Sequence, residues 1–194
     1  ICMSRARRFG KTMITNLMSA YYSKNCDSRD IFESLGLSEQ EGWDKYLNSV
    51  NVIQIDLNGW YSKTKDKSQT IDKLQTGVID ELRKEFPSIE IPADAVLADA
   101  ISIINEEIGE TFVIIIDEYD VLIRDSSVSE ALRKEYIEFL NSIFKSNDVQ
   151  EAVSLAYLTG ILPILRETVH SKLNNFKEYT MLAPDQFAQH FGFT

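Results

Sequence analysis

The most constraining feature of the sequence is an unbroken apolar run at residues 112–116, Phe-Val-Ile-Ile-Ile, which Asp117 and Glu118 follow at once. A continuous β-branched run is typical of a strand buried on both faces in the middle of a parallel sheet. The acids then lie where the strand emerges, at the edge where open α/β sheets bind ligands. Because adjacent strand residues point to opposite sides, one acid can serve a metal and the other an attacking water. The alternative is a core strand that ends in two solvated acids.

A second motif stands near the start of the chain. Residues 4–12, Ser-Arg-Ala-Arg-Arg-Phe-Gly-Lys-Thr, end in the Gly-Lys-[Ser/Thr] signature of a phosphate-binding loop and precede a helical pattern. Gly10 would let the backbone approach phosphates, Lys11 would reach the β- and γ-phosphates, and Thr12 would offer its hydroxyl to Mg²⁺. The helix that opens here aims free amides at the anion. Arg5 replaces the glycine of the usual pattern, so the loop starts without glycine's conformational freedom.

Together these motifs resemble those of a known family. Residues 5–12 resemble the Arg-Pro-Arg-Arg-Phe-Gly-Lys-[Ser/Thr] loop of the bacterial AAA-ATPase-like family, with Ala6 in place of the proline. Residues 115–120, Ile-Ile-Asp-Glu-Tyr-Asp, resemble its Leu-Ile-Asp-Glu-Tyr-Asp segment, and residues 158–160, Leu-Thr-Gly, resemble its later strand end. The resemblance implies that residues 1–194 are one P-loop NTPase domain with Walker A and Walker B motifs. It also implies a nuclease-like domain downstream.

The charge of the chain limits its partners. The formal net charge is −10, which disfavours direct binding of nucleic acid by this segment, because like charges repel. Residues 5–11, by contrast, carry four positive charges before any acid appears. A cationic loop on an acidic body suits a compact polyanion such as a nucleoside triphosphate. The alternative is a solvated basic loop.

The remaining bulk features are those of an ordinary domain. The 194 residues are 44% hydrophobic and 26% charged, which suits one globular domain with a substantial core. Cys2 and Cys26 offer no disulfide framework and no metal-binding spacing, so a reducing cytoplasm is the expected compartment. No stretch has the length of a membrane-spanning helix, so no membrane partner is expected. Because Ile1 is not a natural start, we expect the segment to be a fragment of a longer chain that lacks its extreme amino terminus and its downstream region.

The order of the periodic segments predicts an α/β fold. We expect a P-loop NTPase three-layer sandwich, with a mostly parallel five-stranded sheet and helices on both faces. Strands are expected at residues 1–3, 52–57, 112–116, 152–158 and 179–182, and the main helices at residues 12–23, 68–86 and 94–107 and in a segment opened by a Ser127–Glu130 capping box. The resemblance to NTPases that have a catalytic Glu beside the metal-binding Asp implies that the strand at 152–158 lies between the first strand and the strand before Asp117.

Two connecting segments carry further expectations. Residues 58–67 are polar and are expected to form a mobile loop beside the site. Residues 26–49 are expected to hold two short helical pieces whose aromatic side chains pack over the sheet as a lid or flank.

Three more polar residues are site candidates. Thr159 follows a strand, and its side chain would lie between the acids and the phosphates, where it would orient water or sense the γ-phosphate. Asp56 ends the strand at 52–57 and would touch the water shell of a metal or simply face solvent. Arg166 would reach a phosphate or lie on the surface.

The functional hypothesis is an ATP-binding and ATP-hydrolysing domain that acts as a regulatory or signalling module for an attached domain. Its catalytic residues would be Lys11, Glu118 as the base, and Thr159. Thr12 and Asp117 would hold Mg²⁺. ATP would contact residues 7–13, namely Arg7, Arg8, Phe9, Gly10, Lys11, Thr12 and Met13. The alternatives are a nucleotide-binding or protein-interaction module without hydrolysis and a small-molecule phosphotransferase.

Overall fold

The protein is built around a five-stranded parallel sheet. The computed structural model describes residues 1–163 and 176–180. The strand order is β2-β3-β4-β1-β5, and each strand runs parallel to its neighbours. The strands are β1 (Cys2–Ser4), β2 (Asn51–Asp56), β3 (Phe112–Asp117), β4 (Val153–Gly160) and β5 (Glu178–Tyr179). Strand β4 lies between β1 and β3, which confirms the predicted strand insertion and the α/β class.

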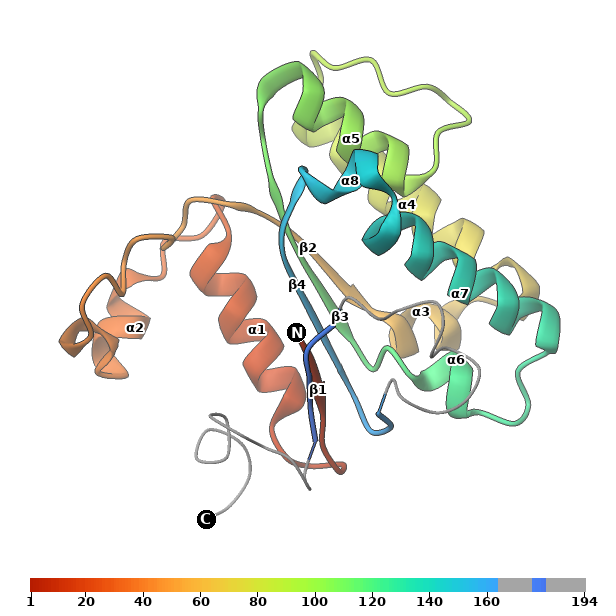
Figure 1. The fold of residues 1–194 in the computed structure, drawn as a ribbon, viewed down its shortest axis with the longest axis horizontal. Coiled ribbons are helices and arrows are strands. Elements are labelled where there is room, and N and C mark those ends of the chain that lie inside the picture. The colour runs from red at the N-terminus through yellow and green to blue at the C-terminus, as the bar shows by residue number, and fades with distance from the viewer. Residues whose placement is uncertain (164–175, 181–194) are drawn as a thin grey trace.

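Helices cover both faces of the sheet. Helix α1 packs on one face, and α4, α5 and α7 pack on the other, as Figure 1 shows. The α-helices are α1 (Lys11–Tyr22), α2 (Arg29–Ser34), α3 (Leu57–Lys63), α4 (Thr70–Glu85), α5 (Leu97–Ile108), α6 (Val121–Arg124), α7 (Glu130–Lys145) and α8 (Asn147–Gln150). Short 3₁₀ turns occupy Leu37–Glu39 and Lys67–Gln69. The helices predicted at residues 12–23, 68–86 and 94–107 are confirmed as α1, α4 and α5, with small shifts at their ends.

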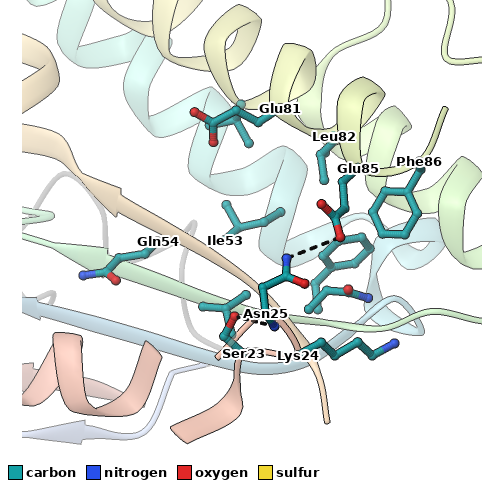
Figure 2. A pocket seen from close by; sticks show the side chains of 13 residues that line it. Ser23, Lys24, Asn25, Ile53, Gln54, Glu81, Leu82, Glu85 and Phe86 are labelled. Atoms are coloured by element: carbon teal, nitrogen blue, oxygen red, sulfur yellow. Dashed lines mark hydrogen bonds between the residues drawn. The ribbon is translucent and has the colours of Figure 1, made fainter. Parts of the chain in front are cut away.

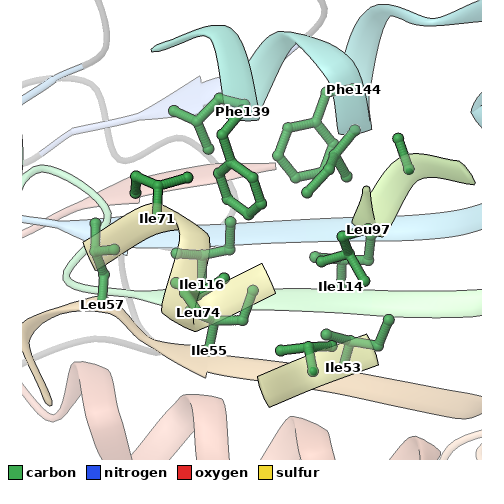
Figure 3. Close-up of a cluster of buried hydrophobic side chains, with 14 of the residues drawn as sticks. Ile53, Ile55, Leu57, Ile71, Leu74, Leu97, Ile114, Ile116, Phe139 and Phe144 are labelled. Atoms are coloured by element: carbon green, nitrogen blue, oxygen red, sulfur yellow. The ribbon is translucent and has the colours of Figure 1, made fainter. Parts of the chain in front are cut away.

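The apolar run of β3 is buried on both faces, as its composition predicts. Ile114 and Ile116 lie in the larger core cluster, together with Leu74 of α4 and Phe139 of α7 (Figure 3). The alternate side chains, such as Val113, belong to a second cluster that packs with residues of α1. Since successive strand residues point to opposite faces, a strand between two helical layers needs apolar residues at every position.

The predicted mobile loop at residues 58–67 is wrong, because most of this segment is helix α3. The carboxylate of Asp56 accepts a hydrogen bond from the Gly59 N–H at 2.9 Å and so caps the first turn. Trp60 packs against the larger core cluster. A capping acid and one aromatic side chain stabilise a helix in a segment whose polar composition suggests a loop.

The predicted capping box at the start of α7 is also wrong. The residue that caps α7 is Ser129, whose hydroxyl accepts a hydrogen bond from the Leu132 N–H at 3.2 Å. The hydroxyl of Ser127 instead donates to Asp125 at 2.7 Å, within the preceding turn. Because the turn already uses Ser127, the helix begins two residues later than the pattern indicates.

The segment at residues 26–49, which was predicted to pack over the sheet as a lid or flank, packs on α1 instead. Helix α2 confirms the first helical piece, whereas residues 41–48, around Trp43, form turns rather than a helix. Phe32 of α2 packs edge-on against Tyr21 of α1, with 5.3 Å between ring centroids. The segment therefore sits on α1, away from the sheet (Figure 1), because α1 offers an aromatic outer side on which these residues bury their rings.

Two further observations complete the fold. The predicted final strand is β5, of which Tyr179 lies in the sheet, while Leu182 falls outside the described residues. Within the described ranges, none of the helices combines the length and the apolarity needed to cross a membrane.

The two thiols are expected to differ strongly in reactivity. Cys2 is buried in β1, and burial raises the pKa of its thiol to about 12, while Cys26 is exposed. Because the thiolate is the nucleophile, a disulfide reagent should modify Cys26 in the native protein and Cys2 only after denaturation. Absorbance of the released thiolate measures this, with Cys26→Ser as the control that shows no rapid native phase. Rapid native labelling of Cys2 would contradict the fold.

Candidate functional site

The carboxyl ends of the central strands meet at one edge of the sheet. Asp117 at the end of β3 is paired in register with Thr159 of β4, and Thr159 is paired in turn with Met3 of β1. The loop at residues 5–10 leaves β1 directly beyond this point. Because all these strands are parallel, segments more than 100 residues apart in the sequence converge on a single edge.

One hydrogen bond joins the two motifs directly. Thr12, in the first turn of α1, donates its hydroxyl to Asp117 Oδ2 at 2.6 Å. The second oxygen, Asp117 Oδ1, accepts the backbone N–H of Glu118 at 2.9 Å. A hydroxyl and a carboxylate oxygen this close are hard ligands of the kind that Mg²⁺ prefers, with waters or ligand oxygens completing its shell. In the part of the chain that the structure describes, no cluster of three or more His, Cys, Asp and Glu residues offers an all-protein metal cage.

The loop makes its sharp turns at Arg8 and Gly10. Both residues have left-handed backbones, with φ of 69° and 76°, and the strain is greater at Arg8, which has a Cβ. Arg5 is not among the residues with positive φ, so the loop manages without the usual first glycine by turning later. Gly10 precedes α1 and makes no side-chain cap, so the first amides of the helix remain available at the mouth of the loop.

The ammonium of Lys11 lies under the loop. Its side chain is 7% exposed, and Nζ donates to the carbonyl oxygens of Arg5 at 3.1 Å and Ala6 at 2.9 Å. Burial lowers the pKa of Lys11, while the carboxylates of Glu118 and Asp117 oppose that shift. The cation is thus hydrogen-bonded to two loop carbonyls, and the negative charges of Asp117 and Glu118 stabilise it.

Arg5 fastens the start of the loop to the sheet. Its guanidinium is buried, and one nitrogen donates to the carbonyl oxygens of Ser4 at 3.0 Å and Tyr179 at 3.4 Å. Tyr179 belongs to β5, which is the neighbour of β1. The arginine that breaks the usual glycine pattern therefore connects the loop to the outer strand.

Glu118 turns away from the strand in a strained conformation. Its φ is 52°, which is uncommon for a residue with a Cβ and is often found at functional sites. Its carboxylate pairs with Arg124 of α6 at 3.1 Å, and Arg124 also lies 3.7 Å from Asp120. Sequence reasoning missed Arg124, since nothing in a four-residue helix marks it as a partner of the acid.

Asp120 is a second residue that sequence reasoning missed. It is 1% exposed, and Oδ2 accepts the backbone N–H groups of Ile161 at 3.1 Å and Leu162 at 2.9 Å. A Cβ on Gly160 would lie only 2.6 Å from Asp120 Oδ1, so glycine is required for this close approach. In the sequence, Asp120 could have been recognised as a third acid close behind the apolar strand to which no role had been assigned.

Thr159 is fully buried beside Asp117 in the sheet register. Its hydroxyl has no hydrogen-bond partner within residues 1–163 and 176–180. An unsatisfied buried hydroxyl is uncommon and indicates a place for water or a ligand. Its predicted role in orienting water stays a prediction.

The other loop residues face outward. Arg7, Arg8 and Met13 are exposed, and Phe9 is partly buried. Their predicted contacts with a nucleotide remain predictions. Arg166, the other candidate phosphate ligand, lies outside the described residues.

The sequence is similar to those of known proteins. The profile of a family described as "AAA-ATPase_like: Predicted AAA-ATPase" matches residues 1–170. A protein of Azotobacter chroococcum mcd 1, described as "Uncharacterized protein in vnfD 5'region", is 25% identical over 183 residues. The match covers 92% of this chain and 34% of that protein, so the chain spans about a third of the relative's length.

Removal of the Asp120 carboxylate should destabilise the site. We expect Asp120→Ala to lower the free energy of unfolding by about 2–4 kcal/mol, because two partly buried amides lose their acceptor and Arg124 loses an ion-pair partner. Urea denaturation measures the difference. The exposed Asp94 gives a matched control, and Asp94→Ala should change stability by less than about 0.5 kcal/mol. Equal effects of the two substitutions would contradict the bracing role of Asp120.

Proposed function

We propose that this chain, which belongs to the AAA-ATPase-like family, binds ATP together with Mg²⁺ and hydrolyses it. The observation that carries the proposal is the 2.6 Å hydrogen bond between Thr12 and Asp117. Phosphoryl transfer depends mainly on positioning and on electrostatic stabilisation, so a cation, a hydroxyl and two acids must lie close together. That hydrogen bond joins the loop to the acidic strand end, from where both would reach the same phosphate group.

The phosphates would lie at the amino terminus of α1. The uncapped first amides and the positive end of the helix attract an anion, and the left-handed backbone of Gly10 lets the chain turn closely around it. Lys11 would exchange one carbonyl contact for a phosphate oxygen. Arg7 and Arg8 are exposed at the mouth and would add positive charge, while Phe9 and Met13 would flank the nucleotide.

The residues fit a magnesium ion. Thr12 and Asp117 would hold it through one hydroxyl and one carboxylate oxygen, a donor set suited to Mg²⁺ that keeps several waters and phosphate oxygens. When bound, the ion supplies neutralisation of the phosphate charge. Asp117 would meanwhile keep its second oxygen on the Glu118 amide, which fixes the orientation of the carboxylate.

Glu118 is the proposed general base for the attacking water. Its strained backbone directs the side chain away from the strand, and Arg124 anchors the carboxylate at 3.1 Å. Thr159 would position the same water, since its buried hydroxyl has no partner among the described residues. Burial at the site would strengthen these interactions compared with water.

We further propose that nucleotide state regulates an attached domain of the same chain, as the resemblance implies for a nuclease-like domain. This chain covers 34% of the relative from Azotobacter chroococcum, which leaves room for such a domain in proteins of this kind. The second candidate function is nucleotide binding without hydrolysis. The ion pair between Glu118 and Arg124 favours it, because it holds the carboxylate against α6 rather than leaving it free to contact an attacking water.

Two substitutions test the assignment. Lys11→Ala should abolish measurable ATP binding, because it removes the buried cation of the loop. Glu118→Gln should retain ATP and lower kcat by about 10²–10⁴-fold, because the base is lost but the shape is kept. Calorimetry and phosphate release measure these effects.

The exposed pair Lys134 and Glu138 of α7 supplies matched controls, and Lys134→Ala and Glu138→Gln should behave as the unsubstituted protein does. Unchanged turnover in Glu118→Gln would contradict the assignment of Glu118 as the general base. ATP binding without any phosphate release by the unsubstituted protein would favour the second candidate. Transfer of phosphate to a small-molecule acceptor rather than to water would favour a phosphotransferase.

The hydroxyl of Thr12 can be tested separately. Thr12→Val keeps the shape of the side chain but removes the metal ligand, so the affinity for Mg-ATP should fall about 10–100-fold. Thr12→Ser restores the hydroxyl and should bind nearly as tightly as the unsubstituted protein. Titration of ATP with and without Mg²⁺ separates the effects. A loss of the same size in the absence of Mg²⁺ would assign Thr12 to the nucleotide rather than to the metal.

A further inference from the structure

Strand β2 is the outer strand of the sheet on the side away from the loop at residues 5–10, and part of its edge is open. It pairs with β3 on its inner side. On the outer side, the Val50 N–H donates to the Tyr22 carbonyl at 2.9 Å, and the Val50 carbonyl accepts from the Lys24 N–H at 3.0 Å. These contacts form a short parallel bridge. The chain then leaves the edge after Lys24.

Backbone N–H and carbonyl groups point to alternate sides along a strand, which shows which groups of β2 are unpaired on its outer side. Because Val50 points its N–H and carbonyl outward, Val52 and Gln54 point theirs outward as well. In the part of the chain that the structure describes, neither of these two residues has a backbone hydrogen bond on that side. An edge with free donors and acceptors is a template for a further strand.

A cavity of about 190 Å³ lies along this edge, between β2 and α4 (Figure 2). Its apolar lining includes Ile53 of β2, Leu82 of α4 and Phe86, which follows α4 directly. The volume suits one long side chain rather than a large ligand. A strand added at Val52 and Gln54 would place alternate side chains over this cavity.

The rim of the cavity is acidic. Glu81 and Glu85 of α4 both line it, and Glu85 accepts a hydrogen bond from Asn25 at 3.3 Å. Lys24 also lines it, but its ammonium is paired with Glu110. An apolar floor below two carboxylates matches a lysine or arginine, whose aliphatic stem can be buried while its charge stays at the rim.

We propose that the open edge of β2 binds an extended basic segment of a partner protein as an added strand. Backbone hydrogen bonds to Val52 and Gln54 would pair the added strand with β2. A cationic side chain in the cavity would make the site selective for basic segments. A second copy of this chain fits less well, because it would bring the same acidic rim and a net charge of −10 against itself. The surface is separate from the loop and does not depend on the proposed ATPase activity.

A synthetic peptide with alternating valine and arginine, labelled with fluorescein, provides the probe. We expect saturable binding by fluorescence anisotropy at low salt, weakened as salt is added. Gln54→Pro should weaken it about tenfold, because proline removes an outward N–H that the pairing with β3 does not use. Gln54→Ala is the matched control and should bind as the unsubstituted protein does. The double variant Glu81→Gln and Glu85→Gln should bind about threefold to tenfold more weakly.

Amide hydrogen exchange provides a readout that needs no substitution. The N–H groups of Val52 and Gln54 should exchange rapidly in the free protein and become protected by the peptide. Those of Ile53 and Ile55 point toward β3 and should be protected throughout.

Three results would overturn the proposal. The first is absence of binding, or equal binding of a peptide with glutamate in place of arginine. The second is binding that leaves the amides of Val52 and Gln54 unprotected. The third is concentration-dependent self-association that Gln54→Pro abolishes, which would assign the edge to a second copy of the chain.

Discussion

The burial of β3 on both faces is the constraint on which the structure depends. A strand of this kind must lie inside the sheet and must have helices above and below it, because every side chain before Asp117 is apolar and buried. Its first polar residue, Asp117, can then appear only where the strand leaves the core. The position of the acid at the sheet edge is thus a consequence of how the core is packed, and the neighbouring strands bring Thr12 and Thr159 to the same place.

The sequence was sufficient for features that depend on periodicity. The central position of β3 follows from its unbroken apolar run, and the long helices α4 and α5 follow from apolar residues spaced three and four apart. The insertion of β4 was expected from the resemblance to nucleotide hydrolases, not from periodicity. The meeting of Thr12 and Asp117 follows from the same topology. The chemical roles of Lys11, Glu118 and Thr159 stay predictions, because position alone does not establish catalysis.

The features that the sequence did not reveal depend on competition between nearby polar groups. Asp56 caps α3, and so a segment of polar composition is a helix rather than a loop. The acid Asp125 engages Ser127 and leaves the cap of α7 to Ser129. The partner of Glu118 is Arg124, which only the turn after β3 brings close. Such choices are decided by geometry in three dimensions, and periodicity contains no information about them.

Arg5 connects two parts of the structure through its backbone and its side chain. Its carbonyl oxygen holds the ammonium of Lys11, while its guanidinium holds the carbonyl of Tyr179. A single residue therefore connects the ammonium of Lys11 to the edge strand β5. An anion that displaced the lysine from the Arg5 carbonyl would therefore act on a residue that is also hydrogen-bonded to strand β5.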